Sequence, residues 1–130
     1  MRTLFHASPV RIDKFDFSKG VHFGAFHSAL EAALRKTDDP EDIIYIHKVK
    51  CKHFAYMNSF DVGCEEEWVK VLAQAKEEGF DVVGYSNRYE PGNSFSFIFT
   101  NDYYITDVEI STITAEDATE EIEMFLSEFD

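Results

Sequence analysis

The chain opens with LFHASPV (residues 4–10), in which a histidine and a serine closely follow an apolar pair. Residues 3–5 predict a short strand, and Pro9 breaks regular structure in the loop that follows. A similar interruption returns in VHFGAF (residues 21–26), where His22 stands among apolar side chains. We therefore expect both stretches to form walls of a small-ligand site at a strand end.

The composition is typical of one folded domain. Hydrophobic side chains make up 45% and aromatic side chains 15% of the 130 residues, unlike the apolar-poor composition of disordered chains. The length suits a single core, so we expect one domain over residues 1–130. No stretch approaches the roughly 20 apolar residues that cross a bilayer, and the first residues lack the apolar run of a signal peptide. We therefore expect a complete cytoplasmic chain without membrane contact.

The charge of the chain limits its partners. The formal net charge is −13, with 25 Asp and Glu residues against 12 Lys and Arg residues. A surface of this sign repels phosphate backbones, so we expect no nucleic-acid partner. A basic protein partner, or mimicry of a polyanion, stays open.

The cysteines are expected to be free thiols and not metal ligands. Without an export signal, Cys51 and Cys64 predict no disulfide. With His47 and His53 they supply ligand types that zinc accepts, but their spacing matches no familiar tetrahedral pattern. We instead expect His47, Cys51 and His53 to face inward from one strand, opposite three lysines.

Hydrophobic periodicity predicts an α+β order of elements. Apolar alternation is typical of strands, and a 3.6-residue apolar repeat is typical of helices. Strands are expected at residues 3–5, 43–57, 80–87, 94–100 and 103–111, and helices at residues 28–36, 65–79 and 114–130. Pairing between the strands should be mostly antiparallel.

Two helices carry start signals in the sequence. Ser28 and Glu31 have the S-x-x-E spacing of a capping box. Thr114 and Asp117 suit the start of the last helix, which has seven acidic residues and neither Lys nor Arg from residue 114 onward. We therefore expect a C-terminal amphipathic helix with one apolar face and one strongly negative face.

Three polar side chains interrupt apolar stretches and are candidate site residues. His6, with Ser8 two residues later, can hold a ribose or carry protons near neutral pH, although on local evidence a surface histidine beside a turn is the simpler interpretation. His22 suits either a site or a satisfied core histidine. Glu90 follows Tyr85 in a turn, where a carboxylate can accept from a ribose hydroxyl or stabilise positive charge on a sugar carbon.

The order of these motifs resembles the ADP-ribosyltransferase superfamily. LFHASPVRIDKFD (residues 4–16) is similar to its opening strand with a histidine and a small residue. VHFGAFHSALEAA (residues 21–33) resembles its second motif, an aromatic or histidine-bearing strand before a helix. EEGFDVVGYSNRYEPGNSFSFIF (residues 77–99) is similar to the third motif, as found in small phage-type domains. The resemblance does not extend to the final helix.

The resemblance implies a fold and a reaction. The fold would be split, with mixed or antiparallel sheets that grip NAD as the cofactor. The activity would be mono-ADP-ribosyl transfer to a basic or host-derived protein, by a phage or mobile-element effector acting in the bacterial host cytoplasm. Ala7 stands where glycine is usual, and its backbone would contact the nicotinamide amide.

The resemblance also implies roles for individual residues. Glu90 would orient the nicotinamide ribose and activate the acceptor, with Ser94 or Ser96 as alternatives at the position of the acid. Phe26 or Tyr85 would replace a tyrosine that stacks on nicotinamide. The implied catalytic residues are His6, His22 and Glu90, and the implied cofactor-binding residues are His6, Ala7, Ser8, Phe23, Phe26, Tyr85 and Asn87.

A non-enzymatic function is the rival hypothesis. The same fold could serve as an acidic binding or inhibitor protein whose last helix docks on a basic partner. That protein would need neither His6 nor Glu90.

Overall fold

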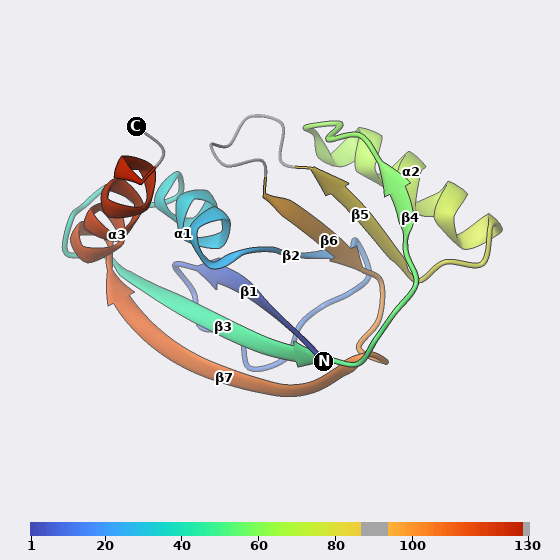
Figure 1. Cartoon of the computed structure of the whole chain (residues 1–130), viewed down its shortest axis with the longest axis horizontal. Helices are drawn as coiled ribbons and strands as arrows, with labels where there is room; N and C mark the ends of the chain where they lie inside the picture. Colours follow the sequence, from blue (N-terminus) through green and yellow to red (C-terminus); the bar gives the residue numbers. More distant parts are fainter. Residues whose placement is uncertain (87–93, 129–130) are drawn as a thin grey trace.

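The computed structural model of the chain describes residues 1–86 and 94–128 (Figure 1). In this part of the chain, seven strands and three helices confirm the predicted α+β class. In order, they are β1 (Arg2–Ser8), β2 (Val21–Phe23), α1 (Phe26–Leu34), β3 (Ile43–Cys51), β4 (Met57–Ser59), α2 (Glu65–Glu77), β5 (Val82–Ser86), β6 (Phe95–Phe99), β7 (Ile105–Thr114) and α3 (Ala115–Ser127).

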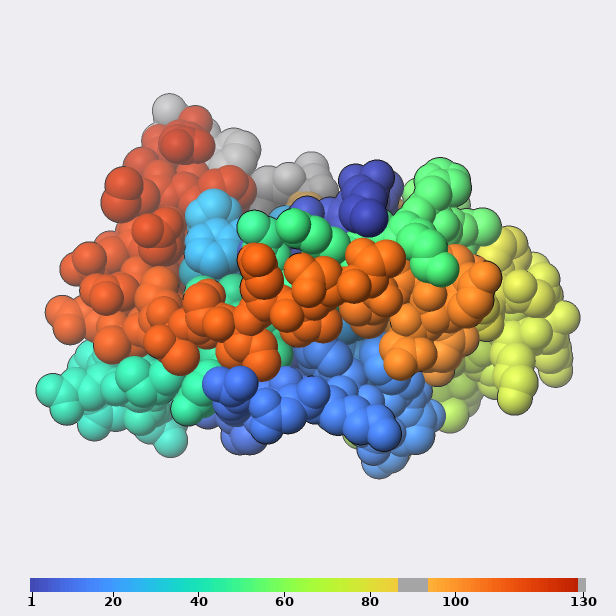
Figure 2. Space-filling view, turned by 90° about the horizontal axis from the view of Figure 1, so that it is seen from below, coloured from blue at the N-terminus to red at the C-terminus, as the bar shows by residue number. Residues whose placement is uncertain are grey.

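The strands form two sheets. Sheet A is antiparallel, with the order β1-β3-β7. Sheet B is mixed, with the order β2-β6-β5-β4; β4 is parallel to β5, and the other pairs are antiparallel. β7 is an edge of sheet A and runs along one side of the molecule, between α3 and the loop that precedes β7 (Figure 2). The three-residue strands β2 and β4 are too short to give a periodic signal in the sequence.

β1 and β2 are joined at one point and then belong to different sheets. The Phe5 N–H donates to the Gly24 carbonyl at 2.8 Å, and the Gly24 N–H donates to the Phe5 carbonyl at 2.9 Å. A Cβ at Gly24 would lie 2.5 Å from the Ser96 Oγ, so a larger residue here would make the Ser96 side chain move. These two hydrogen bonds therefore fix the place where the sheets separate.

Apolar side chains hold the elements in layers. A cluster that includes Phe23 and Phe99 lies between the two sheets. α1 and α3 cover sheet A, where Leu30 and Ile44 are fully buried. α2 covers sheet B over Val83. Both helical layers can be followed in Figure 1.

The helix starts agree with the prediction at α3 but not at α1. The Thr114 Oγ1 caps α3 by accepting from the Asp117 N–H at 3.1 Å, as predicted. The capping box predicted from Ser28 and Glu31 is wrong, because α1 begins at Phe26 and has no side-chain cap. The Ser28 hydroxyl instead hydrogen-bonds the Ser94 hydroxyl, next to β6. Within residues 1–86 and 94–128, no helix has the length and apolar character to cross a membrane.

The predicted alternation along β3 is found only in part, because the helices that cover sheet A also bury Ile44 and Ile46 on the face opposite His47. His47 and Cys51 are buried with no exposed surface, as predicted. The prediction for His53 is wrong, since this side chain is exposed. β3 ends at Cys51, and the alternation of inward and outward side chains ends with it.

Candidate functional site

A cavity of about 310 Å³ opens beside the junction of the two sheets. It contains five of the residues that the sequence assigned to a ligand site. β1 contributes His6 and Ala7, β2 contributes His22 and Phe23, and β5 contributes Tyr85. The fold therefore brings together residues that lie up to 79 positions apart in the chain, since Tyr85 and His6 both line this wall.

A chain of polar contacts links the two histidines to the tyrosine. The His6 Nδ1 donates to the His22 carbonyl at 2.8 Å, which ties the β1 side chain to β2. The His22 Nδ1 lies 2.7 Å from the Tyr85 hydroxyl. Each ring is thereby held in one orientation against the cavity, as a preorganised ligand site requires.

Aromatic rings form one wall of the cavity. Trp68, from α2, packs on Tyr85 with ring centroids 4.7 Å apart. The His22 ring meets Trp68 edge-on at 5.6 Å and Tyr85 at 5.7 Å. A wall of this kind suits a flat ring in the ligand. Trp68 lies within the helix predicted at residues 65–79, and this second role was missed from the sequence.

Charged residues at the cavity were also missed by the sequence analysis. Arg35 and Lys36 follow α1 and line the cavity, and Asp61 lines it from the segment between β4 and α2. Arg35 and Lys36 are exposed, whereas Asp61 is half-buried. Basic residues after a helix are common, so their sequence context carried no signal for a site.

Burial keeps the cavity histidines neutral at pH 7. Burial lowers the pKa of His22 to about 4, and the nearby His6 adds to this effect while Asp61 opposes it. Burial also lowers the pKa of His6, against the opposing hydrogen bond to the His22 carbonyl. A neutral imidazole can accept a hydrogen bond or a proton from a ligand hydroxyl.

Acidification to pH 5 should destabilise the protein through these histidines. The folded His22 binds a proton less readily than the unfolded chain, so its contribution to stability is complete above about pH 6.5 and is lost as the pH falls toward 4. For a pKa of about 4 against 6.5, the free energy of unfolding should fall by about 2 kcal/mol between pH 7 and pH 5. Urea unfolding at both pH values measures the change, in a range where most carboxylates stay ionised.

A His22→Phe variant should lose this part of the pH dependence, whereas His53→Gln should keep it, because His53 is exposed. A wild-type urea midpoint that does not move between pH 7 and pH 5 would contradict the burial argument.

Two predicted cofactor residues do not line the cavity. The Ser8 hydroxyl accepts from the Val10 N–H at 3.1 Å and so belongs to the turn after β1. Phe26 packs edge-on against Phe5 at 5.4 Å, among the side chains between α1 and sheet A. These local contacts place both side chains outside the cavity.

Four predicted residues remain: Glu90 and Asn87, and the serines Ser94 and Ser96. Glu90 and Asn87 fall within residues 87–93, outside the described residues. Ser96, an alternative at the position of the acid, is buried and lines the cavity. Ser94, the other alternative, is hydrogen-bonded to Ser28.

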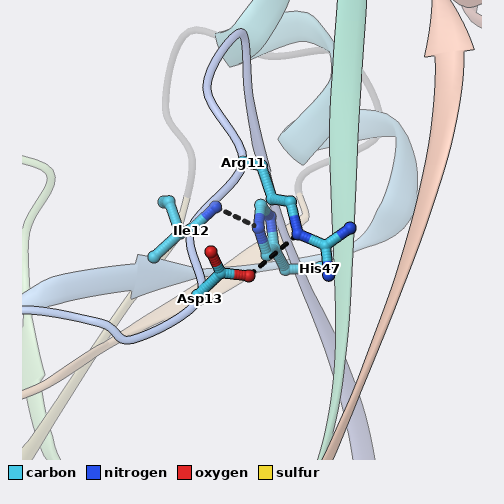
Figure 3. A network of polar contacts seen from close by, with 4 residues as sticks. All are labelled: Arg11, Ile12, Asp13 and His47. Carbon is cyan, nitrogen blue, oxygen red and sulfur yellow. Dashed lines mark hydrogen bonds and ion pairs between the residues drawn. The ribbon is translucent and has the colours of Figure 1, made fainter.

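His47 does not line the cavity but hydrogen-bonds the backbone next to it. Its Nε2 accepts from the Ile12 N–H at 3.0 Å (Figure 3). Its Nδ1 donates to the His6 carbonyl at 3.1 Å. The two bonds require a neutral ring with the proton on Nδ1, and burial lowers the pKa of His47 in agreement. His47 therefore ties the loop after β1 to the strand that carries His6.

The cysteines are free thiols, as predicted, with Cys51 buried and Cys64 exposed. Burial raises the pKa of the Cys51 thiol to about 11, which makes it a weak nucleophile. In the described part of the chain, no three His, Cys, Asp or Glu side chains are grouped to hold a metal ion.

Comparisons of this chain with protein-family models, with curated proteins and with solved structures find no match.

Proposed function

We propose that this protein is an NAD-dependent mono-ADP-ribosyltransferase that modifies a protein, as a phage or mobile-element effector would modify a host protein. The observation that carries the proposal is the cavity beside the sheet junction. It joins His6, Ala7, His22, Phe23 and Tyr85, residues that the resemblance assigns to NAD, from three strands.

The size and charge of the cavity support the dinucleotide as its ligand. At about 310 Å³ it is at the small end of ligand sites, which span about 300–1,000 Å³. It suits the nicotinamide and its ribose, while the rest of NAD lies along the mouth. The pyrophosphate would there meet Arg35 and Lys36, two cations beside the cavity of a protein with net charge −13.

ADP-ribosyl transfer requires mainly that the ribose is positioned and that its developing positive charge is stabilised. The bond between the nicotinamide nitrogen and the ribose C1′ breaks, and nicotinamide leaves with the bonding electron pair. Positive charge develops on the ribose carbon, where an acceptor side chain of the target forms the new bond as it loses its proton. Neutral His6 and His22 hold the ribose hydroxyls, and Glu90 is proposed to stabilise the charge and activate the acceptor.

Incubation with NAD labelled in its adenosine half and a bacterial lysate tests the proposal. The wild-type protein should transfer label to one or a few protein bands, and Glu90→Gln should abolish the bands. Glu77→Gln, the same substitution on the exposed end of α2, is the matched control and should leave them intact. A folded wild-type protein that yields neither labelled bands nor free nicotinamide would contradict the proposal.

The negative result would favour the acidic binding protein, for which α3 provides the observation. Its apolar side packs on α1, where Phe125 stacks on His27 with centroids 4.0 Å apart. The described acids of the helix therefore face solvent: Glu116, Asp117, Glu120, Glu121, Glu123 and Glu128. Such a face suits a basic partner whether the protein is an enzyme or not.

A further inference from the structure

We propose that Asp61 recognises the positively charged pyridinium ring of NAD, so that the site prefers the oxidised dinucleotide to its reduced, uncharged-ring form. This inference rests on the proposed function and adds a specificity residue that neither the sequence motifs nor the resemblance assigned.

Asp61 is a half-buried carboxylate on the cavity wall. Of the lining residues that the structure describes, it is the one acidic side chain. Its Oδ1 accepts from the Gly63 N–H at 3.2 Å, which holds the group at the start of the turn into α2. Among the described residues, 1–86 and 94–128, none forms an ion pair with Asp61, so its charge is available to a ligand.

The neighbours of Asp61 favour a flat cationic ring. Burial lowers the pKa of His22 and the Asp61 charge partly opposes this, so that charge acts on the histidine side of the cavity. His22 in turn contacts Trp68 and Tyr85, whose ring faces attract cations. A carboxylate and aromatic rings that line the same cavity are complementary to pyridinium, which carries its positive charge in a flat ring.

The negative and positive side chains at the cavity come from elements that cover different sheets. Asp61 precedes α2, which covers sheet B, whereas Arg35 and Lys36 follow α1, which covers sheet A (Figure 1). NAD has the matching arrangement, with a cationic ring and an anionic pyrophosphate separated by a ribose. The charges of the site therefore define which way the dinucleotide lies, with the ring toward Asp61.

Titration calorimetry with NAD, NADH and ADP-ribose tests this assignment. Asp61→Asn keeps the shape and the Oδ1 acceptor but removes the charge. We expect NAD to bind about fivefold more weakly, because the variant loses one charge pair that solvent partly screens. Binding of NADH and of ADP-ribose, which lack the cationic ring, should stay unchanged, so the preference for NAD over NADH should fall by the same factor. Asp107→Asn, an identical substitution on the exposed edge strand β7, is the matched control and should change none of the three affinities.

Two further variants make the result decisive. Asp61→Glu should keep the preference for NAD, because it keeps the charge. Lys36→Gln should weaken NAD, NADH and ADP-ribose alike, because all three carry the pyrophosphate. Trp68 is the single tryptophan of the chain and lines the cavity, so its fluorescence reports that NAD and ADP-ribose bind there.

The outcomes separate this inference from the proposed function. A preference for NAD that is the same in wild type and Asp61→Asn would overturn the role of Asp61 and leave the proposed function standing. A wild-type protein that binds neither NAD nor ADP-ribose would overturn both.

Discussion

Replacement of His22 by phenylalanine should reduce ADP-ribosyl transfer about 100-fold or more. Phenylalanine keeps a ring against Trp68 and Tyr85 but removes both nitrogens, including the Nδ1 that lies 2.7 Å from the Tyr85 hydroxyl. Loss of a positioned polar group at a reacting sugar typically costs this much in rate. The measurement is the initial rate of label transfer at saturating NAD, with thermal unfolding recorded for the same sample.

His27→Phe is the matched control for this substitution. His27 lies on α1, stacks on Phe125 and does not line the cavity, so a phenyl ring there should preserve both packing and activity. If His22→Phe transfers label at the wild-type rate, the imidazole takes no part in the reaction. If both variants lose activity together with their melting transitions, the effect belongs to folding.

Replacement of His47 by leucine should lower the free energy of unfolding by about 3 kcal/mol. Leucine fills part of the buried space but leaves the Ile12 N–H and the His6 carbonyl without their partner. An unmet hydrogen-bonding group that is shielded from water costs about 1–3 kcal/mol. Urea unfolding at pH 7 measures the loss, and hydrogen exchange at the Ile12 amide should become faster in the same variant.

Arg11→Ala provides the comparison from the same loop. The Arg11 guanidinium pairs with Asp13 at 2.8 Å on the exposed surface (Figure 3), where solvent screens the pair and it adds little to stability. Its loss should therefore move the urea midpoint little. Equal stability of His47→Leu and wild type would show that the loop is held by other contacts.

Local sequence patterns predicted most of the elements because the elements depend on neighbouring residues. The apolar repeat of residues 65–79 predicted α2, and the Thr114 cap predicted the start of α3. Alternation along 43–57 predicted the burial of His47 and Cys51. The prediction for His53 failed because periodicity does not mark where a strand ends.

The candidate site was predicted in part, from polar residues that interrupt apolar stretches. His6, Ala7, His22, Phe23 and Tyr85 do line one cavity. Ser8 and Phe26 are close to these residues in sequence but not in the cavity, because the Ser8 hydroxyl bonds the turn after β1 and Phe26 packs on Phe5 between α1 and sheet A.

The sequence by itself determined the α+β class, most strands and helices, the free thiols and the acidic face of α3. Tertiary structure alone decided that β1 and β2 meet at Phe5 and Gly24, that Ser28 bonds Ser94, and that Lys36 and Asp61 line the same cavity. The physical reason is the range of the interactions. Periodicity and capping act within a few residues, whereas the hydrogen bonds that build the site join positions 16 and 63 residues apart, and such pairs are chosen by how the layers pack.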